Sequence, residues 1–156
     1  MRIGFDLDGI FIDKPPLIPK KLIEWLYRGH DHTLFYRFPP RIEQWVRNMT
    51  HIYFLRPPIT ENIKYIKHIR QTNAHTYYLI SSRFSFLKTR TEKILAQYQL
   101  TALFDGMHFN LHDKQPHLFK DEIISILHID QYIDDDLPLL TFLAGKATDT
   151  SFLCLL

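Results

Sequence analysis

The sequence predicts an α/β fold in which a parallel β-sheet is covered by helices on both faces. Along the second half of the chain, apolar segments of strand length alternate with amphipathic segments of helix length. The strand segments are almost continuously apolar, as is typical of strands buried on both faces. The chain has 156 residues, of which 46% are hydrophobic, so we expect one domain over residues 1–156 with a single substantial core.

The first third of the chain predicts one strand followed by an insertion bounded by prolines. The segment RIGFDLDGI, residues 2–10, begins as an apolar strand and delivers Asp6 and Asp8 at its end. Prolines and short helical patterns then favour a small helical insertion over residues 14–58. Three helices are expected in this part of the chain, at residues 20–30, 41–49 and 60–72.

The rest of the chain alternates regularly between strand and helix. We expect strands at residues 75–81, 106–110, 131–136 and 151–156. We expect helices at residues 86–100, 118–128 and 138–147. Ligands of such sheets bind beyond the carboxyl ends of the strands. Polar residues that follow strands are therefore expected along one edge of the sheet: Asp6, Asp8, Ser81, Ser82, Asp134, Asp135 and Asp136.

The net charge of +2 hides an uneven distribution. Residues 14–75 carry eleven Lys and Arg against four Asp and Glu, which makes this segment +7 and leaves the remainder at −5. A basic segment over an acidic site suits an anionic substrate held with a metal cation. The simpler alternative is a solvated basic surface.

Composition and termini favour a cytoplasmic protein without a membrane partner. The single cysteine, Cys154, forms no internal disulfide and fits a reducing compartment, where core packing is its expected role. The N-terminus MRIGFDLDG lacks the pattern of a signal peptide. No stretch approaches eighteen consecutive apolar residues, so we expect no membrane span.

The residues at the sheet edge suit phosphoryl chemistry with magnesium. Mg²⁺ is held by one or two carboxylates together with substrate phosphate, and Asp6 with one or two of the acids at 134–136 offers such ligands. A carboxylate can act as a nucleophile that forms an aspartyl-phosphate, and a second acid can carry protons for the leaving oxygen and for water. A lysine and a hydroxyl group would stabilise the charge of the phosphoryl group.

In this pattern the chain resembles the haloacid dehalogenase (HAD)-like superfamily of phosphohydrolases, whose four motifs follow the same order. FDLDGI resembles the first motif, which implies that Asp6 is the nucleophile and Asp8 the acid/base, with the Asp8 backbone carbonyl as a metal ligand. Gly9 is expected to form a tight turn behind Asp8. YYLISSR resembles the second motif, which implies that Ser81 contacts the transferring phosphoryl group.

The third and fourth motifs lie in the last third of the chain. The third motif needs a lysine near the start of a helix, and Lys120 fits it better than Lys114. YIDDD resembles the fourth motif, which implies that Asp134 and Asp135 hold the metal. The adjacent acids depart from the commoner spacing and are similar to those of the small nucleotidases of this superfamily. The resemblance therefore implies a three-layer Rossmann-like, HAD-like fold with a small helical cap insertion.

The resemblance further implies that the insertion closes over the site, excludes water and selects the leaving group. Its basic and aromatic residues suit a phosphorylated aromatic compound such as a nucleotide. They are Arg37, Arg41, Arg47, Arg56, Tyr36, Phe38, Trp45, Tyr53 and Phe54. The alternative is that these aromatic residues form the small core of the cap. We expect substrate contacts from Arg41, Arg56 and Ser82, and from Arg83 unless it forms a surface salt bridge.

These patterns predict a Mg²⁺-dependent phosphomonoester hydrolase that acts through an aspartyl-phosphate on Asp6, with nucleoside monophosphates as candidate substrates. The expected partner is a small phosphorylated molecule and not a nucleic-acid polymer. The alternative function is a non-catalytic or signalling phosphate-binding module on the same fold. A response-regulator receiver fits poorly, because its phospho-acceptor lies on a middle strand and the middle strand of this chain ends in serine.

Overall fold

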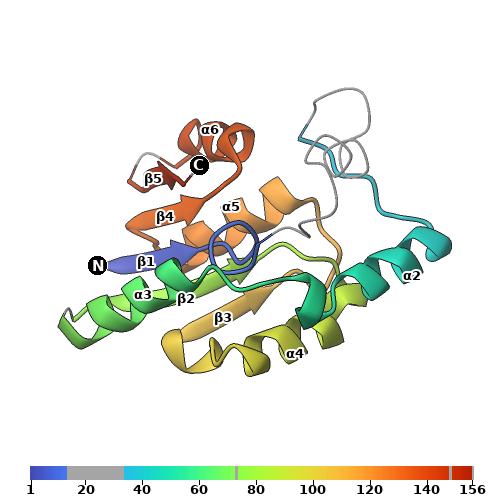
Figure 1. Cartoon of the computed structure of the whole chain (residues 1–156). Coiled ribbons are helices and arrows are strands. Elements are labelled where there is room, and N and C mark those ends of the chain that lie inside the picture. Colours follow the sequence, from blue (N-terminus) through green and yellow to red (C-terminus); the bar gives the residue numbers. More distant parts are fainter. Residues whose placement is uncertain (14–33, 73, 148, 156) are drawn as a thin grey trace.

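The structure, a computed structural model, describes residues 1–13, 34–72, 74–147 and 149–155. In this part of the chain five strands form one sheet in the order β3-β2-β1-β4-β5, and all neighbours run parallel (Figure 1). The strands are β1 (Arg2–Phe5), β2 (Thr76–Ser81), β3 (Gly106–Phe109), β4 (Gln131–Asp134) and β5 (Ser151–Cys154). The prediction of a parallel α/β sheet is confirmed.

Helices cover both faces of this sheet, which gives three layers. The helices α3 (Thr60–Thr72) and α4 (Lys88–Gln97) pack on one face, in the apolar cluster that contains Phe5 and Leu79. The helices α5 (Pro116–Leu127) and α6 (Leu137–Ala144) pack on the other face, in a second cluster around Tyr132. Because the side chains of a strand alternate between faces, β2 and β4 contribute residues to both clusters. None of the described helices combines the length and apolar character that a membrane span requires.

Some expected elements are shorter than their sequence patterns. The expected helix at 86–100 begins as the 3-10 turn η2 (Ser85–Leu87), and α4 ends at Gln97. It ends there because Gln99 has a φ of 54°, a left-handed conformation in which a helix cannot continue. The last strand ends at Cys154, three residues after Ser151.

The insertion leaves and rejoins the core at one place. The Asp13 N–H donates to the Pro57 carbonyl and the Ile59 N–H to the Phe11 carbonyl, each at 2.9 Å. Its described part holds α2 (Arg41–Thr50) and the short η1 (Tyr53–Leu55), which confirms the helix expected at 41–49. The helix expected at 20–30 lies outside the described residues, as do residues 14–33 as a whole.

The helix α2 turns its polar side inward, which bears on the alternative that the aromatic residues of the insertion form a small core. Arg47 is its buried residue, whereas Ile42 is 81% and Trp45 66% exposed. Most of the aromatic residues considered as a cap core are also exposed, with Phe54 at 83%, whereas Tyr36 is half-buried. The interpretation of these residues as a cap core is therefore wrong for Trp45 and Phe54.

Candidate active site

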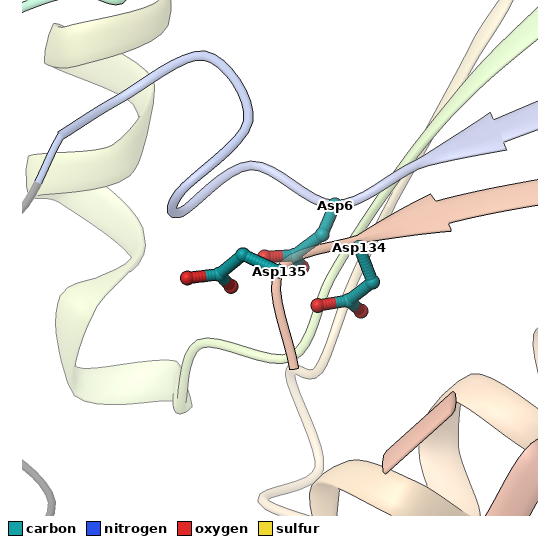
Figure 2. Close-up of side chains that lie close together, drawn as sticks. All are labelled: Asp6, Asp134 and Asp135. Carbon is teal, nitrogen blue, oxygen red and sulfur yellow. The ribbon is translucent and has the colours of Figure 1, made fainter. Parts of the chain in front are cut away.

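Three acids meet at the carboxyl ends of β1 and β4. Asp6 directly follows β1, and its N–H donates to the Ile133 carbonyl of β4 at 2.9 Å, so the parallel pairing brings Asp6 beside the end of β4. Figure 2 shows Asp6, Asp134 and Asp135 side by side at these strand ends. Asp6 and Asp134 are buried and Asp135 is half-buried. One carboxylate oxygen from each of the three lies within 4.8 Å of the others. This oxygen-rich arrangement is suited to Mg²⁺.

Gly9 makes the close approach of Asp135 possible. Its φ is +78°, a conformation that residues with a Cβ rarely adopt. A Cβ added at Gly9 would lie 2.2 Å from Cγ of Asp135. The expected turn behind Asp8 is confirmed, and the structure adds that this glycine also leaves room for a carboxylate of the acid cluster.

Asp136, the third acid of the run, has a different role. Its Oδ1 accepts from the Leu139 N–H at 3.2 Å and so caps α6, and its Oδ2 accepts from the Tyr36 hydroxyl at 2.8 Å. Asp136 therefore joins the insertion to the start of α6, while Asp134 and Asp135 complete the acid cluster.

Lys120 supplies the buried cation of the site. Its side chain extends from α5 and is 3% exposed, and its Nζ lies 2.9 Å from Oδ1 of Asp6 and 2.7 Å from Oδ2 of Asp134. The Lys114 ammonium instead pairs with Glu122 in a half-exposed ion pair. The geometry therefore selects Lys120 over Lys114 as the lysine that reaches the acids.

The buried acids compete for positive charge. Burial raises the pKa of Asp6 to about 8, against the lowering effect of Lys120, and the Asp134 and Asp8 carboxylates raise it further. Burial opposes the charge of Lys120, but Asp134 and Asp6 outweigh it and hold the pKa of this ammonium well above its usual value. Lys120 alone therefore does not offset the effect of burial on the pKa of Asp6. A divalent cation at the cluster would favour the ionised carboxylate.

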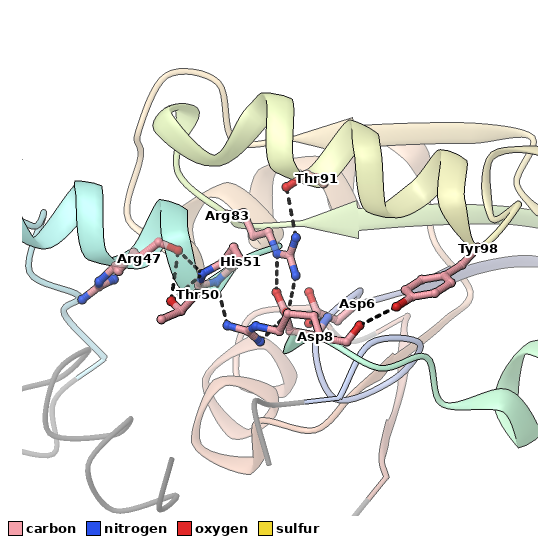
Figure 3. Close-up of polar contacts among 9 residues, drawn as sticks. Asp6, Asp8, Arg47, Thr50, His51, Arg83, Thr91 and Tyr98 are labelled. Carbon is pink, nitrogen blue, oxygen red and sulfur yellow. Dashed lines mark hydrogen bonds and ion pairs between the residues drawn. The ribbon is translucent and has the colours of Figure 1, made fainter. Parts of the chain in front are cut away.

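Asp8 points to a different set of partners. Arg83 donates to both of its oxygens, from Nε to Oδ2 at 2.7 Å and from Nη2 to Oδ1 at 2.6 Å (Figure 3). Arg56 of the insertion adds a donor from Nη1 to Oδ1 at 3.3 Å. Burial raises the pKa of Asp8, but the two guanidiniums outweigh this and hold the pKa well below its usual range. Arg83 therefore forms a partly buried salt bridge inside the site, not the surface salt bridge considered from the sequence.

His51 links Arg56 to the helix α2. Its Nε2 lies 2.7 Å from Nη2 of Arg56, and its Nδ1 lies 2.7 Å from the Arg47 carbonyl oxygen. Burial lowers the pKa of His51 well below its usual value, and the charges of Arg56 and Arg83 lower it further, so the ring is neutral at pH 7. His51 was not predicted from the sequence, because a histidine just after a helix carries no pattern that distinguishes it from a surface residue.

The two serines at the end of β2 differ in exposure. Ser81 is 1% exposed, and its Oγ has no hydrogen-bond partner among the described residues. Ser82 is partly exposed. Both line the cavity described below. A buried hydroxyl without a partner is costly, so Ser81 is suited to a ligand that supplies an acceptor.

A cavity of about 480 Å³ connects the acids with the insertion. Its floor is formed by the acids with Lys120 and the serines, and Tyr36, Arg47 and Arg56 reach it from the insertion. Arg41, expected at the substrate, is exposed on α2 and does not line this cavity. Arg41 and Arg47 lie six positions apart, so they face different sides of the helix, and Arg47 is the arginine of α2 that faces inward.

Comparisons with known proteins identify the fold. No model of a known protein family matches the chain, and no curated protein does either. A chain of the Pnkp1/Rnl/Hen1 RNA repair complex matches over 99% of this chain and 42% of its own length, with 15% identity and a TM-score of 0.62. A HAD family enzyme from Bacteroides thetaiotaomicron, solved as an aspartate-to-alanine mutant with magnesium and inorganic phosphate, matches over 97% of this chain and 92% of its own, with 13% identity and a TM-score of 0.61.

At these identities the similarity establishes a shared fold. The chain has a HAD-like α/β fold, in agreement with the resemblance found in its motifs. It spans less than half the length of the chain that it matches in the RNA repair complex.

Proposed function

We propose that the protein is a Mg²⁺-dependent phosphomonoester hydrolase that acts through an aspartyl-phosphate on Asp6. The observation that carries this proposal is the position of the Asp6 carboxylate, 2.9 Å from the Lys120 ammonium and within a cluster of three acids. This arrangement combines a nucleophile, a buried positive charge and metal ligands at one point. Further support comes from the HAD family enzyme of the same fold, which was solved with magnesium and inorganic phosphate.

In the first step a carboxylate oxygen of Asp6 forms a bond to phosphorus, and the bond from phosphorus to the ester oxygen breaks. The departing oxygen takes a proton from the Asp8 carboxyl group. The two arginines keep Asp8 ionised before substrate binds. Asp8 therefore has to take up a proton before it can protonate the departing oxygen of an ester. An ester with a weakly basic leaving oxygen, such as 4-nitrophenolate, departs without this proton.

In the second step a water oxygen forms a bond to phosphorus, and the bond between phosphorus and Asp6 breaks. The water proton passes to the Asp8 carboxylate, and inorganic phosphate leaves together with a regenerated Asp6 carboxylate. Lys120 and the Ser81 hydroxyl, which has no partner in the described part of the chain, are suited to donate hydrogen bonds to the phosphoryl oxygens in both steps. Asp6, Asp134 and Asp135, with the Asp8 backbone carbonyl, would hold Mg²⁺, which neutralises phosphoryl charge when bound.

Nucleoside monophosphates are the substrates that we propose to test first. The cavity joins apolar and aromatic walls, including Tyr36 and Phe84, to the arginines Arg47 and Arg56. A ring beside an aromatic wall and an anion beside guanidiniums are the contacts that a nucleotide offers. Its volume of about 480 Å³ lies within the range usual for small-molecule sites.

The proposal is tested by phosphate release with Mg²⁺, using 4-nitrophenyl phosphate and a panel of nucleotides and sugar phosphates. We expect the wild-type protein to release phosphate and Asp6→Asn to lose at least 10³-fold in kcat, because the amide is not a nucleophile. Because asparagine has nearly the same shape as aspartate, this substitution removes the nucleophile with little change in packing. Equal release by both proteins would overturn the proposal.

The alternative of a phosphate-binding module makes a different prediction in the same assay. A module of this kind would bind inorganic phosphate, as seen by calorimetry, and release none from any ester. The described site favours turnover, because every step above has a chemically competent residue among Asp6, Asp8, Ser81 and Lys120.

A further inference from the structure

The Asp8 carboxylate is held from two sides. Arg83 comes from the core, where the Thr91 hydroxyl of α4 accepts from its Nη1 at 3.1 Å. Arg56 comes from the insertion and donates to Oδ1 of Asp8 at 3.3 Å. Among the described residues, Oδ1 therefore accepts two hydrogen bonds and Oδ2 accepts one, from Nε of Arg83 at 2.7 Å. Since each carboxylate oxygen has two lone pairs, Oδ2 retains the capacity to accept a proton.

The position of Arg56 is determined by His51 and by Tyr98, the residue that directly follows α4. The Tyr98 hydroxyl donates to the Arg56 backbone carbonyl at 2.9 Å (Figure 3). Arg56 is 6% exposed. The far end of the guanidinium meets His51, which is 3% exposed. A long arginine side chain loses much rotational freedom in such a position. His51 and Tyr98 thus hold Arg56 in place before a substrate arrives.

The tautomer of His51 follows from its two closest partners, because the third, the Thr50 hydroxyl oxygen, lies 3.5 Å from Nδ1 and itself donates to the Arg47 carbonyl. The Arg47 carbonyl oxygen can only accept, so the 2.7 Å contact requires the proton on Nδ1. The Nε2 lone pair then accepts from the Arg56 guanidinium, which can only donate. Both ring nitrogens therefore have a partner, and a second proton, on Nε2, would point at the positively charged Arg56 guanidinium. His51 is thus a neutral acceptor that connects the end of α2 to Arg56.

We propose that His51 is a positioning residue of the hydrolytic step. Through Arg56 it keeps the Asp8 carboxylate oriented with Oδ2 available to take the proton of the attacking water. In that step the water oxygen bonds to phosphorus, the bond from phosphorus to Asp6 breaks, and the proton goes to Asp8. This inference rests on the proposed function, and it gives the insertion a part in the breakdown of the aspartyl-phosphate.

The experiment is rapid-mixing kinetics with 4-nitrophenyl phosphate and Mg²⁺, which separates the two steps. Release of the first equivalent of 4-nitrophenolate reports formation of the aspartyl-phosphate, and the later steady rate reports its breakdown. The two matched variants are His51→Asn, whose amide keeps a donor for the Arg47 carbonyl but does not reach Arg56, and His51→Gln, whose longer amide supplies an acceptor for Arg56. Met49→Ala, at an exposed position of the same helix, is the control.

We expect His51→Asn to release the first equivalent within about twofold of the wild-type rate and to slow about tenfold in the steady phase, as is usual when an outer partner of a reactive group is lost. A burst of one equivalent per site should therefore appear or grow. We expect His51→Gln and Met49→Ala to behave like the wild type. Thermal melting of each variant verifies that it is folded.

Two results would overturn the role of His51 in an active enzyme. One is an equal slowing of both phases in His51→Asn, which indicates a structural role. The other is identical kinetics in His51→Asn and His51→Gln. If the wild-type protein releases no 4-nitrophenolate, the proposed function itself is overturned. If the wild-type protein is active but His51→Asn shows no burst, only the role of His51 is overturned.

Discussion

The carboxyl edge of the sheet and the described part of the insertion, residues 34–58, face the same cavity but bury opposite kinds of side chain. At the sheet edge, acids follow strands whose side chains are buried in two apolar clusters. In the insertion, α2 buries Arg47 and exposes Ile42 and Trp45. Apolar residues therefore mark the buried side of the strands in the core, but they mark the exposed side of α2.

This difference follows from what each region contacts. The strands are surrounded by helices, so only apolar side chains are stable between the layers. The helix α2 instead lies over a site with an ionised acid, where buried arginine and histidine find partners. The Arg47 guanidinium pairs with Glu43, and His51 contacts Arg56, which reaches Asp8. Polar residues face inward where the neighbours are charged.

After Asp6→Asn, the largest effect is expected from Lys120 at the sheet edge. Lys120→Met leaves Asp6 and Asp134 buried without their cation, so we expect kcat to fall about 10²–10³-fold. The free energy of unfolding should fall by about 3–5 kcal/mol without metal, because one partner of a buried ion pair is lost. Steady-state kinetics and urea denaturation measure both. Lys114→Met is the matched control, and a loss of similar size there would contradict the assignment of Lys120.

A second test concerns the turn behind Asp8. Gly9→Ala forces a side chain into a positive φ and against Asp135, so we expect a loss of about 2 kcal/mol in the free energy of unfolding and weaker Mg²⁺ binding. Chemical denaturation and calorimetry measure these effects. Gly145→Ala is the control, because Gly145 has a φ of −71° and an added Cβ would approach no atom closer than 3.4 Å. An unchanged Mg²⁺ affinity in Gly9→Ala would contradict the claim that Gly9 makes room for Asp135 in the acid cluster.

The third test uses pH in the presence of a chelator. The pKa of Asp6 is raised from 3.8 to about 8 in the folded protein, so its contribution to stability is fully present below pH 3.8 and is lost as the pH rises to about 8. The metal-free protein should therefore have a Tm that falls across this window, by about 2–4 °C for each kcal/mol lost. Asp6→Asn should flatten the dependence. Parallel curves for the two proteins would contradict the raised pKa.

The smallest effects are expected for KM, where two arginines of the insertion should differ. Arg56→Ala should raise KM for an anionic substrate several-fold, because Arg56 lines the cavity, and it should also slow the steady phase as His51→Asn does, because its contact with Asp8 is lost. Arg41→Ala should leave KM unchanged, since Arg41 is exposed outside it. Steady-state kinetics on the best ester of the panel measures both values. A larger effect at Arg41 would mean that substrate extends over the outer side of α2.

Much of the fold and part of the site could be predicted from local patterns. Alternation of apolar strands with amphipathic helices predicts the parallel sheet, because each element has to bury its apolar side against another layer. The rule that ligands bind beyond the carboxyl ends of strands then gathers Asp6, Ser81 and Asp134 at one edge. These predictions need only the order of the elements, which the sequence contains.

The choice between neighbouring candidates was decided only by the tertiary structure. Lys120 reaches Asp6 because it lies on the buried side of α5, whereas Lys114 precedes this helix and pairs with Glu122. Arg47 rather than Arg41 faces the cavity because of the phase of α2. Arg83 and Arg56 meet Asp8 across 75 and 48 positions of the chain. Contacts at such separations depend on how the layers and the insertion pack, which no local pattern specifies. By itself the sequence determined which strand ends carry the acids, and packing determined which cations meet them.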